Sequence, residues 1–326
     1  MVNVIAWFIR GFLLVRNPFS SKKFACVRAH NTLFIYRINQ EIVIFDYYQY
    51  LLGLLKAAVK QDQFLIIQLD TLRFKWFSAL APILSIGFQI EHTLIKKGTR
   101  GSEQAIAEGL PFHDSHSRYL VRIQNFQELM QYDRIIDYSR INLRQVKSAS
   151  IPILARYSKR NHCISPCIFA IDQVSIFNLH QRTKTITTFG NPSESRRAKF
   201  LNELLTRGIP VENITGNYLD IENCYRSTRI LINIRQTNGY DTLEELRILP
   251  ALRSGVIVIN ELAPYQQYCR YSEFILSASI EHLPNLIQDV QNHYVKYHAQ
   301  IFTSAFFTRM ARLERINQLT ANRLLQ

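Results

Sequence analysis

The second half of this 326-residue chain alternates short apolar runs with amphipathic segments, and this alternation limits the fold more than any other feature. Three runs have the length and composition of buried strands: 185–189 (TITTF), 229–234 (RILINI) and 256–259 (VIVI). Helical segments follow at about 194–206, 242–254 and 281–293. Gly255 stands directly after the second helix, where a left-handed residue can end it. This order predicts a doubly wound α/β fold with a parallel sheet.

The first half carries a less regular version of the same pattern. Predicted strands lie at 42–45 (IVIF), 63–69 (QFLIIQL), 87–94 (GFQIEHTL) and 134–138 (RIIDY), and predicted helices at 48–60 and 77–84. This half has neither a Gly-x-Gly-x-x-Gly turn nor a Walker loop, so a dinucleotide-binding or P-loop fold has no support.

Two separate strand–helix runs in a chain of this length predict two domains that face each other across a cleft. Pro152 and Pro166 lie in a region with little periodicity, so we place the passage between the domains near 150–175. The expected parts are a basic apolar segment at 1–23, a smaller or more degenerate α/β domain at 24–160, a second α/β domain at 161–302 and an amphipathic helix at 303–326.

The composition is globular but strongly basic. Apolar residues make up 47% of the chain, and the formal net charge is +14. The basic residues form no arginine-rich run and accompany no zinc-finger or RNP-like motif, so only the charge suggests a nucleic-acid-binding protein. Five scattered cysteines, an odd number, favour a reducing compartment over a disulfide framework, and we expect a cytoplasmic protein.

Both ends of the chain are basic and apolar. Residues 1–23 combine apolar runs with Arg10, Arg16, Lys22 and Lys23, a composition that suits an anionic membrane surface or a buried N-terminal element. The apolar run is too short to span a bilayer. In the tail, 303–324 places Phe306, Met310, Leu313 and Leu324 along one stripe of a helix, which can dock onto the protein or lie on a membrane.

A spaced series of motifs in the second half resembles a known enzyme family. The series begins with Gly190-Asn191-Pro192 and Arg196-Arg197, continues with 208–211 (GIPV) and 229–234 (RILINI), and ends with 246–252 (LRILPAL) and 255–261 (GVIVINE). It is similar to the C-terminal domain of GT-B glycosyltransferases of the family 1/4-like type, over about residues 188–290.

The resemblance implies a GT-B fold of two Rossmann-like domains, with a nucleotide-diphosphate sugar bound by the second domain and a glycan or lipid-linked acceptor by the first. It implies no cofactor and no metal, and the sequence has no Asp-x-Asp pair to hold a divalent ion. It also suggests that the C-terminal helix returns to the first domain. One departure is Pro250, which stands where retaining members often carry a glutamate.

Candidate donor-binding residues follow from the chemistry of a diphosphate. The N-terminus of the helix predicted from Thr242 supplies free N–H groups and a positive dipole end, and Thr242 with Glu245 forms a capping box there. Arg247 lies one turn into that helix, and strand or turn ends carry the remaining candidates: Gly190, Asn191, Asn233, Arg235 and Glu261.

His92 and Glu245 are the candidate catalytic residues, with His92 as general base. Each alternative stays open: His92 as a structural histidine, Thr242 and Glu245 as plain helix caps, and Arg247 as a surface residue. His113 with His116 and Cys163 with Cys167 are weak metal motifs, and no metal site is expected. The sequence therefore predicts a metal-independent glycosyltransferase, cytoplasmic or peripheral at the inner membrane face. The alternatives are a catalytically silent sugar-nucleotide-binding module and a basic nucleic-acid-binding protein.

Overall fold

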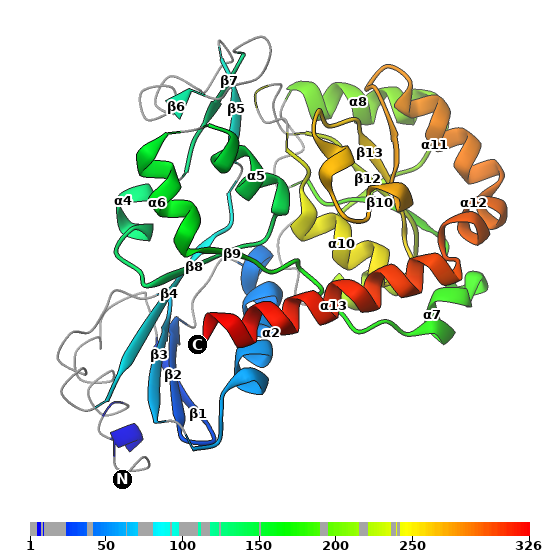
Figure 1. The fold of residues 1–326 in the computed structure, drawn as a ribbon. Coiled ribbons are helices and arrows are strands. Elements are labelled where there is room, and N and C mark those ends of the chain that lie inside the picture. The colour runs from blue at the N-terminus through cyan, green and yellow to red at the C-terminus, as the bar shows by residue number, and fades with distance from the viewer. Residues whose placement is uncertain are drawn as a thin grey trace.

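The computed structural model describes residues 5–7, 9, 24–37, 42–62, 64–70, 81–91, 93–97, 110–111, 118–123, 125–149, 151–189, 195–214, 221–235, 239 and 242–326. These residues form two α/β domains, with the C-terminal helix running across both (Figure 1). In this described part of the chain, no helix is long and apolar enough to cross a membrane.

The first domain is built on a six-stranded sheet. Its order is β1 (Phe24–Ala29), β2 (Thr32–Arg37), β3 (Leu65–Leu69), β4 (Ile83–Gln89), β8 (Arg134–Asp137) and β9 (Asn161–Cys163). All neighbours are parallel except β1 and β2, which form an antiparallel hairpin. Because the spatial order follows the chain order, this sheet lacks the reversal of a regular doubly wound domain. A small antiparallel sheet of β5 (Leu94–Lys96), β7 (Tyr119–Val121) and β6 (Leu110–Pro111) stands at its upper end (Figure 1).

Three predictions for the first domain are wrong in whole or in part. The strand predicted at 87–94 is divided, because β4 ends at Gln89 and Leu94 begins β5 in the small sheet. The run 42–45 is the start of helix α2 (Ile42–Ala58) and not a strand. A short apolar run does not distinguish a strand from a buried helix, and here the buried side chains of Tyr47, Leu51 and Leu55 extend the helical spacing. The helix predicted at 77–84 is contradicted at its end, since Ile83 and Leu84 belong to β4 and pair with β3. Residues 77–80 lie outside the described residues.

The boundary between the domains also lies later than expected. After β8 come α5 (Arg140–Ser148) and α6 (Pro152–Arg160), and then β9, which pairs with β8. The first sheet therefore extends to Cys163, beyond the expected boundary at 160. Residues 164–172 then connect this sheet to α7 (Gln173–Phe177).

The second domain has the predicted doubly wound sheet. Its order is β11 (Glu212–Asn213), β10 (Lys184–Thr187), β12 (Thr228–Asn233), β13 (Ile257–Glu261) and β14 (Leu276–Ala278), and every neighbouring pair is parallel. The helices are α8 (Ser195–Thr206), α9 (Ile221–Arg226), α10 (Glu245–Arg253), α11 (Leu283–Asn292) and α12 (Tyr294–Ile301). The strand order reverses between β10 and β12, and open α/β sheets bind their ligands at such a switch point.

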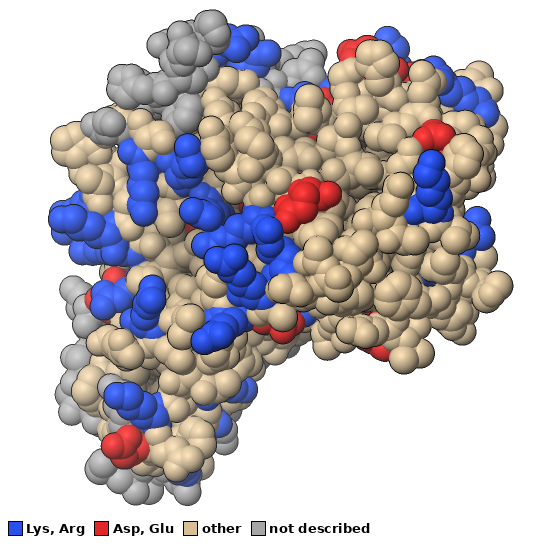
Figure 2. All heavy atoms as spheres, turned by 45° about the vertical axis from the view of Figure 1, so that its right-hand side comes forward, with Lys and Arg blue, Asp and Glu red and all other residues tan. Residues whose placement is uncertain are grey.

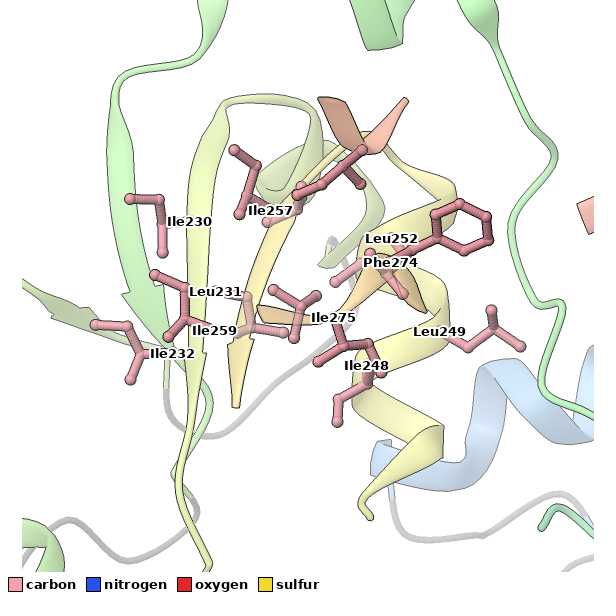
Figure 3. Packing of buried hydrophobic residues seen from close by; sticks show 14 of the residues in the cluster. Ile230, Leu231, Ile232, Ile248, Leu249, Leu252, Ile257, Ile259, Phe274 and Ile275 are labelled. Atoms are coloured by element: carbon pink, nitrogen blue, oxygen red, sulfur yellow. The ribbon is translucent and has the colours of Figure 1, made fainter. Parts of the chain in front are cut away.

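The core of the second domain holds these strands in place. Figure 3 shows side chains of β12 and β13 facing Ile248 and Leu252 of α10, and all of these side chains are buried. Each large apolar side chain buried in this way contributes about 1.5–3 kcal/mol. Helix α10 ends as predicted at Gly255, whose φ of 82° is left-handed.

Helix α13 (Ser304–Leu324) joins the two domains. Phe306, Met310 and Leu313 pack in the core of the second domain, whereas Leu324 packs in the core of the first, next to α2. At the crossing, the buried Asn317 donates to Tyr50 Oη (2.9 Å) and to the carbonyl of Ser165 (2.8 Å), and accepts from the Ser165 amide (3.0 Å). The predicted docking of the tail onto the first domain is confirmed.

Only residues 5–7 and 9 of the N-terminal segment are described. Ala6 and Ile9 are buried among side chains of β1, β2 and β3, whereas Trp7 is exposed. This part of the segment therefore packs as an element of the first domain.

Candidate functional site

A cavity of about 580 Å³ lies at the carboxyl ends of the second sheet, beside the switch point. Its described lining comes from the first turns of α8, the ends of β12 and β13, the loop after β14 and one residue of the first domain. The lining residues are Lys96, Arg196, Lys199, Phe200, Glu203, Arg235, Glu261, Leu262, Ser279, Ile280 and Glu281. The fold thus brings together residues far apart in sequence where a doubly wound domain binds its ligand.

Two arginines share the carboxylate of Glu261. Arg196 binds it through both guanidinium nitrogens, at 2.5 Å to Oε1 and 2.7 Å to Oε2. Arg235 contacts Oε1 with its guanidinium and Oε2 with its backbone amide (3.1 Å). Arg196 also donates to the Arg235 carbonyl (3.0 Å), so hydrogen bonds connect all three residues.

The cavity has an excess of positive charge. Burial alone would raise the pKa of Glu261, but hydrogen bonds from Arg196 and Arg235 hold this pKa below its usual value, so the carboxyl is ionised. One carboxylate against two guanidinium groups leaves a net positive centre. The lining also carries Lys96 and the exposed Lys199, against Glu281 and Glu203, of which Glu203 is already paired with Arg207 (2.7 Å). Counting Arg196, Arg235 and Glu261, four cations face three carboxylates in the described lining. The arrangement suits a multiply charged anion such as a diphosphate.

Helix α8 adds its N-terminus to this wall. It begins at Ser195 and presents Arg196, Lys199 and Glu203 to the cavity, at the helical spacing that places them on one face. The first N–H groups of a helix and its dipole favour negative charge nearby. The predicted contacts Gly190 and Asn191 precede this helix but lie outside the described residues.

The first domain closes one side of the cavity through Lys96 in β5. The backbone amide of Lys96 donates to the carbonyl of Gly239, in the loop after β12, at 2.9 Å. A ligand in the cavity therefore lies against both domains.

Among the predicted donor residues, Arg235 and Glu261 are part of this cavity. Asn233 lies behind them, buried, and donates to the Oδ1 of Asn260 at 2.7 Å. Thr242 is also buried. Arg247 forms an ion pair with Glu244, and none of the described lining residues comes from α10.

The predicted capping box is wrong. Helix α10 begins at Glu245, its N-cap is Glu244, and no side chain caps it. Glu245 instead turns toward the first domain, where it accepts hydrogen bonds from Ser139 Oγ (2.5 Å) and Tyr271 Oη (2.8 Å). The Thr-x-x-Glu pattern describes local spacing only. Here the Glu245 carboxylate binds Ser139 of the first domain and does not cap the helix.

Glu245 is fully enclosed in the contact between the domains. Burial raises its pKa to about 7, against hydrogen bonds from Ser139 and Tyr271 that lower it. Burial likewise raises the pKa of the nearby Asp137 to about 8. The Oδ1 of Asp137 accepts from the Ser139 amide (2.9 Å) and from Asn142 Nδ2 (3.2 Å). Glu245 and Asp137 are therefore two protonatable carboxyls enclosed where the two domains meet.

The remaining predicted residues are three histidines and two cysteines. His92, His113 and His116 lie outside the described residues, so their roles stay predictions. Burial raises the pKa of both Cys163 and Cys167, the latter to about 11, so neither thiol is activated. In the described part of the chain, no group of three or more His, Cys, Asp or Glu side chains is placed to hold a metal.

Sequence reasoning missed three cations of the cavity as site residues: Lys96, Arg196 and Lys199. Arg196 was visible within the family-like series but was not assigned a contact. The available signal was two basic residues in the first turns of a helix that follows a strand and a Gly-Asn-Pro turn. Lys96 had no such signal, because it reaches the cavity through the packing of the two domains.

No protein-family model and no curated protein matches this chain. Among solved structures it aligns with TarM over 87% of its own length and 58% of TarM, at 11% identity and a TM-score of 0.46. It also aligns with a chain of the GtfA/B complex over 85% of its length and 58% of that chain, at 10% identity and a TM-score of 0.37. The chain thus spans 58% of the length of each of these structures.

Proposed function

We propose that this protein is a glycosyltransferase that moves a sugar from a nucleotide-diphosphate donor to a glycan or lipid-linked acceptor. The observation that carries the proposal is the cation-rich cavity at the switch point of the second sheet, closed on one side by the first domain. Doubly wound domains bind nucleotides at this place, and the family-like motifs lie in the same domain.

The proposed task of the cavity is to hold the donor's diphosphate and stabilise it as the leaving group. Arg196, Lys199 and the N-terminus of α8 supply positive charge where negative charge develops as the sugar bond breaks. Glu261 fixes the directions of Arg196 and Arg235, so neither guanidinium has to be ordered when the donor binds. Preorganised donors of this kind stabilise a transition state more than mobile ones.

The acceptor belongs on the first-domain side of the cleft, beside Lys96. We retain His92 as the proposed general base for the acceptor hydroxyl, since it lies four residues before Lys96. Asn233 and Thr242 are proposed to support the donor site from behind, because both are buried. We also propose that the reaction needs no metal, because the cations of the cavity supply the charge that a metal would bring.

The test is a panel of UDP, GDP, TDP and CMP sugars, measured by thermal shift and by release of the nucleotide. A sugar nucleotide that binds the folded protein raises its melting temperature by mass action. We expect one nucleotide class to stabilise the protein and to be turned over in the presence of a chelator. A folded protein that no sugar nucleotide stabilises would contradict the proposal.

A second candidate function is a sugar-nucleotide-binding module without catalysis. The observation that favours it is Pro250, which is buried within α10 at the position where retaining relatives often carry glutamate. Binding without release of nucleotide, across a range of acceptors, would favour this candidate over the enzyme.

A further inference from the structure

Lysine and arginine side chains gather on one broad face of the molecule, away from the sugar-nucleotide cavity. Figure 2 shows this concentration of positive charge crossing from the first domain to the second. We define the basic face by five residues that come from three parts of the fold: Arg140, Arg144 and Lys147 of α5, Arg270 between the short helices η3 (Gln266–Tyr268) and η4 (Ser272–Phe274), and Arg312 of α13.

Contacts and shared charge connect the three elements that carry these side chains. Arg140, Arg144 and Lys147 follow one another at helical spacing along one stripe of α5, and all three are exposed. The guanidinium of Arg144 lies 3.7 Å from the ring centroid of Tyr268, which joins α5 to the second domain. Burial, and then the like charges of Arg140 and Arg312, lower the pKa of Arg270, so these three arginines share one positive field.

The nearby carboxylates do not neutralise this face. Glu273 is paired with Arg309 (2.9 Å), Glu314 is paired with Arg253, and Glu245 is buried between the domains. Among the described residues, none of the five cations of the basic face forms an ion pair with an acidic side chain. Like charges at helical spacing destabilise α5, so the array is costly unless an anion covers it.

The side chains around the basic face favour a lipid surface. Exposed apolar side chains occur on the same or adjoining elements: Ile153 on α6, which packs against α5, Leu319 two turns after Arg312 on α13, and Tyr268 beneath Arg144. Basic residues mixed with apolar and aromatic ones are typical of protein surfaces that lie against anionic headgroups.

A single-stranded nucleic acid would need an open aromatic face on which to stack a base. Tyr268 does not offer one, because Arg144 lies over its ring and Tyr265 stacks with it at 6.3 Å.

The N-terminal segment is less suited to this role in the part that is described. Ala6 and Ile9 are buried in the first domain, so their apolar surface is not available to a bilayer. We propose that the basic face, and not the apolar side chains of this segment, docks the protein on a membrane surface rich in anionic phospholipid. This inference goes beyond the transferase activity and does not depend on it.

The test is flotation of the full-length protein with vesicles of phosphatidylcholine alone and of phosphatidylcholine mixed with phosphatidylglycerol. The variant Arg140→Gln/Arg144→Gln/Lys147→Gln removes three charges from exposed positions. A basic residue near an anionic surface contributes about fivefold to partitioning, so we expect binding to the mixed vesicles to fall on the order of 100-fold. Wild-type binding should also weaken as salt is added.

A matched control removes the same number of charges elsewhere. Arg207→Gln/Arg226→Gln/Lys296→Gln lies on exposed positions of the second domain, and it should bind the mixed vesicles as the wild type does. A second control, Arg10→Gln/Arg16→Gln/Lys22→Gln/Lys23→Gln, keeps Ala6 and Ile9 and should retain most of the binding. Circular dichroism melting verifies that each variant folds.

Several outcomes would overturn the proposal. They are a wild type that does not bind the mixed vesicles, an α5 variant that floats with them as well as the wild type does, and a loss of vesicle binding in the N-terminal variant alone. Tight binding of single-stranded RNA that the α5 variant loses, without vesicle binding, would assign the face to nucleic acid. Since the cavity lies elsewhere, the α5 variant should keep its affinity for sugar nucleotides, which separates this test from that of the proposed function.

Discussion

Raising the pH from about 4.5 to 7 should weaken the contact between the two domains. The carboxyl of Glu245 lies in this contact, where Ser139 of the first domain and Tyr271 of the second domain hold it. Its pKa rises from 4.5 to about 7 on folding, chiefly because it is buried. The folded protein therefore keeps a proton that the unfolded chain releases between these two pH values.

The sign and the size follow from this difference in bound protons. Stability falls with rising pH wherever the folded state binds more protons, so the contribution is complete below pH 4.5 and is lost by about pH 7. A shift of this size corresponds to about 3 kcal/mol for Glu245, at about 1.4 kcal/mol per pH unit. Asp137, whose pKa rises to about 8, acts in the same direction.

The assay is urea unfolding at a series of pH values, for the wild type and for Glu245→Gln. Glutamine can accept from one partner and donate to the other, because both Ser139 and Tyr271 carry hydroxyls, but it does not titrate. The wild type should lose about 3 kcal/mol more than the variant between pH 4.5 and pH 7. Parallel stability curves for the two proteins, or a wild type that gains stability relative to the variant, would refute the reasoning.

Three further predictions concern single residues. Asn317→Ala leaves both backbone groups of Ser165 without their buried partner, so the free energy of unfolding in urea should fall by about 2–4 kcal/mol. An unchanged urea midpoint would show that α13 does not join the domains through this contact. Gly255→Ala places a Cβ atom 2.6 Å from Arg182 Nη2 on a left-handed backbone, so the melting temperature of the variant should fall by several degrees. An unchanged melting temperature would contradict the left-handed conformation of residue 255. Arg247→Ala breaks the ion pair with Glu244 outside the cavity, so in calorimetry it should weaken sugar-nucleotide binding less than Arg196→Ala does. A larger loss of affinity in Arg247→Ala would place the donor site nearer to α10.

The second domain was predictable because its strands and helices are locally encoded. The run 229–234 supplies Ile230, Leu231 and Ile232 to the buried part of β12, and Gly255 ends α10 where a left-handed residue was expected. The stripe of Phe306, Met310 and Leu313 likewise predicted a helix that docks onto the protein, and all three side chains are buried. In these segments local spacing and tertiary packing agree.

The errors arise where packing between distant parts overrides the local pattern. Residues 42–45 have strand-like composition but continue into the buried face of α2. Glu245 has the spacing of a helix cap, yet Ser139, 106 residues earlier in the chain, takes its carboxyl. Arg235 and Glu261 were predictable from their place at strand ends, whereas Lys96 enters the cavity only because the domains meet. No local pattern encodes such contacts.

The central claim is that the donor's diphosphate binds among Arg196, Lys199 and the N-terminus of α8. The most direct measurement is the dissociation constant of the stabilising sugar nucleotide for Lys199→Gln and Arg196→Ala, with Arg226→Gln as the control. Arg226 is exposed on α9, paired with Glu222 and outside the described lining of the cavity. Loss of a charge-assisted contact costs about 1.5–3 kcal/mol, so each cavity variant should bind roughly 10- to 150-fold more weakly while the control is unchanged. Folded cavity variants that bind the sugar nucleotide as tightly as the control would contradict the account.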